Sequence, residues 1–171
     1  MPSVKECGLS LQAVEEYADY IRKIVDQYEP NLRGRELADW LVTRLKGEAV
    51  IPSMWGTDNS GSLVVRSKTD FTIHLSPYTS PLHDVFTIIH ELGHYFLHCD
   101  FDADMKEVAR FNRVGSNREE WQANRFAAAL LMPKAEFQKE WTKYDKNPWM
   151  VGAYFGVSSS AARIRAETLG L

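Results

Sequence analysis

The chain has 171 residues, of which 44% are apolar and 25% are charged, and this supply of apolar side chains is sufficient for a hydrophobic core. The composition excludes a chain that is disordered throughout. The net charge of −3 is unfavourable for a protein whose main role is to bind nucleic acid.

The N-terminal residues do not have the pattern of a secretion signal. The first 23 residues carry acidic side chains at positions 6, 15, 16 and 19 and contain no apolar core of the kind that a signal peptide needs. No window approaches the ~20 apolar residues of a membrane helix. Cys7 and Cys99 are too few for a disulfide framework or a four-thiolate zinc site. We therefore expect a cytoplasmic protein that does not insert into a membrane.

The first half of the chain predicts two helices followed by short strands. Apolar residues recur at helical spacing over residues 10–28 and again over residues 37–45. From residue 48 the period changes, and the short apolar runs at 49–51, 63–65 and 71–75 predict strands separated by turns. Residues 71–75 alternate between apolar and polar, which predicts a half-buried strand. Its edge is a candidate for docking an extended substrate over residues 71–76.

The second half predicts helices. Pro81 opens a strongly apolar helix that continues to residue 98, and residues 117–132 form a second helix that Pro133 ends. Further helices are expected at 134–144, 148–155 and 159–169. The order of helices, short sheet and helices predicts an α+β fold in which a small sheet packs on helix 81–98. We place the main domain at residues 1–132 and a C-terminal helical segment at residues 133–171.

The most informative motif is HELGH at residues 90–94, inside the predicted helix 81–98. On a helix, His90 and His94 project from the same face one turn apart, so both imidazoles can reach one metal ion. Glu91 is rotated by about 100° from His90, so it lies beside the ion and can take a proton from a water there. The alternative is a pair of hydrogen-bonded core histidines, but three ionisable residues in a buried helix are costly without a ligand.

A catalytic zinc site needs a third protein ligand. Glu120 is the first choice because it lies on the next long helix, where Asn124 shares its face and can hydrogen-bond His90 or His94. His98 lies ~12 Å along the helix axis from His90, so we expect it to support the site rather than bind the ion. Four further alternatives have weaker support from their positions: Glu119, Asp100, His74 and His83.

Two long stretches resemble the ImmA/IrrE family of metallopeptidases. The first is FTIIHELGHYFLH at residues 86–98, and the second is EWQANRFAAALLMP at residues 120–133. Residues 155–171 also resemble the usual ending of that family. The resemblance covers residues 71–171 well and the N-terminal third loosely.

The resemblance implies a zinc-dependent endopeptidase with a thermolysin-like site. It implies that His90, His94 and Glu120 bind Zn²⁺ and that Glu91 is the general base. It also implies a protein substrate, namely a partner repressor with a helix-turn-helix whose cleavage relieves repression of transcription.

Two other functions remain open. Residues 148–169 have the form of a helix-turn-helix, but its second helix offers only Arg163 and Arg165 against Glu167, so DNA binding is the weaker prediction. The other alternative is a binding or regulatory protein that contains zinc and does not cleave.

A peptidase also needs a donor that stabilises the oxyanion of the reacting carbonyl. The sequence leaves this donor open among four residues: Tyr78, His83, Tyr95 and Tyr144.

Overall fold

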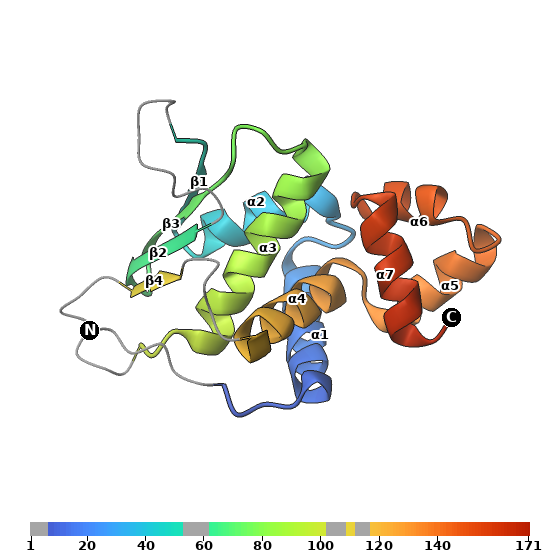
Figure 1. Ribbon diagram of the computed structural model, residues 1–171, viewed down its shortest axis with the longest axis horizontal. Coiled ribbons are helices and arrows are strands. Elements are labelled where there is room, and N and C mark those ends of the chain that lie inside the picture. The colour runs from blue at the N-terminus through green and yellow to red at the C-terminus, as the bar shows by residue number, and fades with distance from the viewer. Residues whose placement is uncertain (1–6, 53–61, 102–108, 112–116) are drawn as a thin grey trace.

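The computed structural model describes residues 7–52, 62–101, 109–111 and 117–171. Its elements in chain order are α1 (Leu11–Tyr28), α2 (Gly34–Arg44), β1 (Glu48–Val50), β2 (Ser62–Ser67), β3 (Asp70–His74), α3 (Pro81–His98), β4 (Ala109–Phe111), α4 (Asn117–Leu131), α5 (Lys134–Lys143), α6 (Pro148–Phe155) and α7 (Ser159–Leu169). Helix α3 runs through the middle of the molecule, with the sheet on one side and α5–α7 on the other (Figure 1). The fold is α+β, as the sequence predicted.

Helices α1 and α3 begin where a serine side chain caps them. The hydroxyl of Ser10 accepts from the Ala13 N–H at the start of α1, and the hydroxyl of Ser80 accepts from the His83 N–H at the start of α3. All seven helices in the described part of the chain were predicted to within a few residues. Helix α2 begins earlier than the predicted residue 37, because its first turn is polar and contributes nothing to the apolar period.

The sheet has the strand order β1-β3-β2-β4. Strand β3 pairs with β1 in parallel, where Ala49 faces Ile73, and with β2 in antiparallel, where Leu63 faces Ile73. The expectation that residues 71–76 offer a free edge is therefore wrong, because both neighbours use the backbone of β3. The edges of the described sheet are β1 and β4. Strand β4 was not predicted, since its sequence Ala-Arg-Phe has a charged residue in the middle and no apolar run.

Helices α3 and α4 approach each other closely at Gly93. A Cβ atom at this position would lie 3.1 Å from the Cα and 3.2 Å from the carbonyl oxygen of Ala123. The glycine therefore lets the two backbones come close together. Gly93 belongs to the HELGH motif of α3, and Ala123 lies one turn after Glu120 on α4, so the close contact sets the distance between the motif and Glu120.

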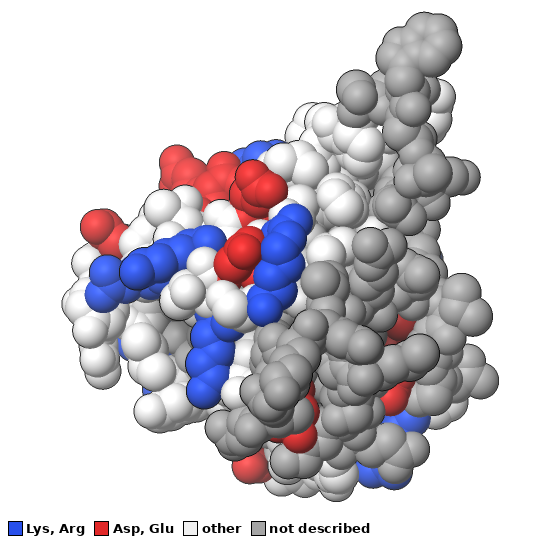
Figure 2. All heavy atoms as spheres, turned by 90° about the vertical axis from the view of Figure 1, so that its left-hand side faces the viewer, with Lys and Arg blue, Asp and Glu red and all other residues white. Residues whose placement is uncertain are grey.

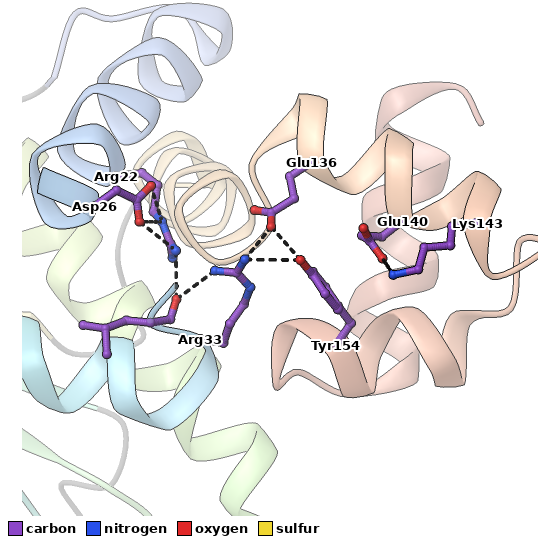
Figure 3. A network of polar contacts seen from close by, with 8 residues as sticks. Arg22, Asp26, Arg33, Glu136, Glu140, Lys143 and Tyr154 are labelled. Carbon is purple, nitrogen blue, oxygen red and sulfur yellow. Dashed lines mark hydrogen bonds and ion pairs between the residues drawn. The ribbon is translucent and has the colours of Figure 1, made fainter. Parts of the chain in front are cut away.

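The C-terminal helices are attached to α2 and the loop before it. Arg33 donates to the Glu136 carboxylate and, at 3.3 Å, to the Tyr154 hydroxyl, which itself donates to Glu136 at 2.9 Å (Figure 3). The backbones of Gly34 and Gly156 touch, since a Cβ at Gly34 would lie 2.8 Å from the Gly156 carbonyl oxygen. Both glycines have a positive φ, so both the space and the conformation favour glycine. The domain boundary at residues 132 and 133 stays a prediction.

The surface mixes charges of both signs. On the face seen in Figure 2, the coloured Lys and Arg side chains lie beside Asp and Glu side chains. Among the helices in the described part of the chain, we find none with the length and apolar character required to cross a membrane.

Candidate metal centre

Two helices bring three donor side chains together. His90 and His94 lie one turn apart on α3, and their Nε2 atoms are 3.2 Å apart. Glu120, in the first turn of α4, places Oε2 3.3 Å from His90 Nε2 and Oε1 3.2 Å from His94 Nε2. Within the described residues, these side chains form a group whose donor atoms all lie within 4.8 Å of one another.

The spacing of the donors fits a tetrahedral zinc ion. Ligands bound ~2.0–2.1 Å from zinc at tetrahedral angles lie about 3.3 Å from one another. The Nε2 atoms of His90 and His94 are 3.2 Å apart, and each lies 3.2–3.3 Å from a different oxygen of the Glu120 carboxylate. Two imidazoles and a carboxylate are also a donor set found in catalytic zinc sites, where the fourth position is left for water or substrate.

The ring of His90 is oriented by α4. His90 Nδ1 lies 3.0 Å from the Asn124 side-chain oxygen, so Nδ1–H donates and Nε2 is turned toward Glu120 and His94. Asn124 is four residues after Glu120, so the same face of α4 contributes both groups. The sequence predicted that Asn124 would hydrogen-bond either His90 or His94, and in the structure it contacts His90.

The ring of His94 contacts a second buried polar chain. His94 Nδ1 lies 3.1 Å from His98 Nδ1, and His98 Nε2 lies 3.0 Å from the side-chain oxygen of Gln122. The Gln122 amide nitrogen donates to the carbonyls of Cys7 at 2.9 Å and Leu9 at 2.8 Å. Gln122 was missed by the sequence analysis. Its position four residues before the buried Phe126 is the signal that could have placed it on the buried face of α4.

Burial sets the charges at the centre. It lowers the pKa of His94 to about 3, with the nearby His90 adding to the effect, and it also lowers the pKa of His98. The ring of His90, whose Nε2 lies 3.3 Å from Glu120 Oε2, holds the pKa of Glu120 below its usual range. At neutral pH, His94 therefore offers a neutral ring and Glu120 an ionised carboxylate. Glu91 is buried on α3 directly after His90, with 3% of its surface exposed.

The other residues considered as ligands lie outside this group of donors. His74 is in the sheet, with Nδ1 3.4 Å from the Ser62 hydroxyl. Glu119 precedes Glu120 and is partly buried, and Asp100 follows the end of α3. Burial raises the pKa of the Cys99 thiol to about 12, so it stays protonated rather than acting as a thiolate ligand.

Two of the residues considered as oxyanion donors have clear positions. The Tyr95 hydroxyl donates to the Lys68 carbonyl at 2.7 Å, and burial raises the pKa of Tyr95 to about 12, so this tyrosine has a structural role. The other is His83, which lies beside a groove.

His83 lines a groove of about 730 Å³ that is bounded by α3, α4 and α7 and by the start of α1. Asn124 also lines this groove, which therefore begins beside His90. Four exposed apolar side chains face into it, one each from α1, α3, α4 and α7: Leu11, Leu82, Trp121 and Ile164.

Comparison with known proteins agrees with the motifs. Residues 56–167 match the family model of Peptidase M78, described as the IrrE N-terminal-like domain. The match includes all of α3 and α4, and so all three donor residues. A comparison with curated proteins found no similar sequence. The family match confirms the resemblance seen in the sequence, and the chain belongs to the Peptidase M78 family of IrrE N-terminal-like domains.

Proposed function

We propose that the protein is a zinc-dependent endopeptidase that cleaves a partner transcriptional regulator. The observation that carries the proposal is the group formed by His90, His94 and Glu120, in which the two imidazole nitrogens have the spacing of tetrahedral zinc ligands and each faces one carboxylate oxygen. Membership of a peptidase family supports the same chemistry.

Each residue has a role that follows from its chemistry. His90 and His94 would bind the ion through Nε2, and Glu120 would add the negative charge that balances part of the charge of Zn²⁺. When bound, zinc supplies Lewis acidity, which polarises a peptide carbonyl and lowers the pKa of water toward neutral pH. Glu91 would take the proton of the attacking water and deliver it to the amine of the leaving peptide.

The groove beside His90 supports a protein substrate. Its volume of about 730 Å³ is sufficient for several side chains of an extended peptide, and it begins at Asn124, which contacts a proposed ligand. The regulator itself is proposed from the family resemblance, in which the substrate is a repressor with a helix-turn-helix.

Glu91→Gln separates a peptidase from a zinc protein that only binds. The variant is expected to bind one zinc ion, as the wild type does, and to lose cleavage, because the amide cannot accept the proton. Both proteins would be loaded with zinc, analysed for metal and incubated with a proteome-derived peptide library and with full-length repressors, and new N-termini would be identified by mass spectrometry. Cleavage that survives in Glu91→Gln contradicts the role of Glu91.

Glu120→Gln tests the third ligand. We expect the substitution to lower zinc affinity by at least tenfold, since a neutral amide is a weak zinc ligand. Glu119→Gln is the matched control, because it removes the same charge one position away on the same helix. Equal zinc affinity in the two variants would exclude Glu120 as a ligand.

DNA binding through α6 and α7 has less support. The two helices are joined by a tight turn at Gly156, as in a helix-turn-helix. Both arginines of α7 are already paired, since Arg163 contacts Glu167 and the buried Arg165 contacts Glu15. This leaves little of the positive charge that phosphate contacts require. A mobility-shift titration at several salt concentrations checks this alternative.

A further inference from the structure

A chain of hydrogen bonds connects the segment before α1 to the metal centre. It runs from the carbonyls of Cys7 and Leu9 through Gln122 and His98 to His94. We propose that Gln122 is a positioning residue that sets the tautomer of His98 and, through it, that of His94. The proposal rests on the proposed role of His94 as a metal ligand.

The anchor carbonyls set the orientation of the Gln122 amide. The amide nitrogen lies 2.9 Å from the Cys7 carbonyl oxygen and 2.8 Å from that of Leu9. A carbonyl oxygen only accepts, so the –NH₂ group must face these two atoms and both of its hydrogens are used. The amide oxygen then faces His98. Gln122 is 1% exposed, which keeps this orientation away from competing solvent.

The proton positions on the two histidines follow in order. Since the Gln122 oxygen accepts, His98 must carry a proton on Nε2, and in its neutral ring Nδ1 is an acceptor. His94 Nδ1 lies 3.1 Å from this acceptor, so it must carry the proton that is donated. His94 is then left with a lone pair on Nε2, the atom that faces Glu120 and His90. That lone pair is what a metal ligand requires.

Loss of the Gln122 oxygen would remove this bias. His98 could then carry its proton on Nδ1, in which case His94 Nδ1 would have to accept and Nε2 would be protonated. A protonated Nε2 does not bind a metal ion. The anchor residues 7–9 lie outside the family match at residues 56–167, so part of the chain beyond the matched domain supports its proposed metal site.

Long-range ¹H–¹⁵N NMR of the metal-free full chain tests the proposal directly, because it identifies the protonated nitrogen of each histidine ring. We expect a proton on Nε2 of His98 in the wild type. Gln122→Met should disturb this tautomer and lower zinc affinity by about 10–100-fold, as is usual for groups that support metal ligands. Zinc affinity would be measured by competition with a chelator. Gln138→Met, at an exposed position of α5, is the control.

A second variant separates positioning from simple support of the fold. Gln122→Glu keeps an acceptor for His98 and loses the donors to Cys7 and Leu9. It is expected to keep the wild-type tautomers and more of the zinc affinity than Gln122→Met. A wild-type His98 protonated on Nδ1, or equal tautomers and affinities in the two Gln122 variants, would overturn the proposal. Because the NMR result needs neither zinc nor cleavage, failure of the proposed peptidase function would be seen separately.

Discussion

Arg165 and Glu15 form an ion pair although they lie 150 residues apart in the sequence. Arg165 is 1% exposed, and its Nε also donates to the Met132 carbonyl at 3.1 Å. The pair joins α7 to α1, and Met132 is the residue at which α4 leads into α5. The C-terminal helices are therefore held to the rest of the chain by a buried charge and its partners.

Arg165→Met should destabilise the protein. The substitution leaves the volume nearly filled but removes the ion pair with the partly exposed Glu15 and the bond to the Met132 carbonyl, so we expect a loss of about 1–3 kcal/mol. Urea unfolding of the two proteins measures the difference. Arg163→Met on the same helix is the control, because its pair with Glu167 is exposed and contributes about 0.5 kcal/mol or less. Equal losses in the two variants would contradict the anchoring role of Arg165.

Gly93→Ala should push α3 and α4 apart. The added methyl group would meet Ala123 at 3.1–3.2 Å, so the helices must shift by a few tenths of an ångström. We expect a loss of about 1–3 kcal/mol in stability, together with weaker zinc binding because α4 carries Glu120. Thermal unfolding and chelator competition measure the two effects. Zinc affinity equal to that of the wild type would show that the spacing of the helices does not set the donor geometry.

The metal-free protein should lose stability as the pH falls below about 6.5. The pKa of His94 falls from 6.5 to about 3 on burial, so between these values the unfolded chain binds a proton that the folded protein does not. Acid therefore favours unfolding, and the lowered pKa values of His98 and Glu120 act in the same direction. Melting temperatures measured across this range should fall less steeply for His94→Gln. Parallel curves for the two proteins would rule out His94 as a source of the slope.

Trp121→Ala should weaken binding of a peptide substrate. Trp121 is 63% exposed and lines the groove beside the metal centre, so a bound peptide would cover it. We expect KM to rise by about tenfold, which corresponds to the loss of one well-packed aromatic contact, while kcat changes little. Trp149→Ala is the matched control, because Trp149 is 74% exposed on α6 and does not line the groove. An equal KM in the two variants would place the substrate elsewhere.

The sequence by itself determined the helices and the placement of His90 and His94 on one face of α3. Helical spacing and capping residues act over a few positions, so the bounds of α3 and α7 could be derived without a structure. The two histidines of HELGH face one side for the same local reason. Glu120 was preferred from its place on the next helix, but its distance from the imidazoles depends on how α3 and α4 pack at Gly93.

Only the tertiary structure decided which distant groups meet. The internal position of β3, the contact of Asn124 with His90 across 34 residues, and the chain from Cys7 through Gln122 to His94 all join segments that are far apart in the sequence. A periodic pattern shows which face of an element is buried, but it does not show which other element covers that face. That choice depends on the shapes and charges of all the packed surfaces together.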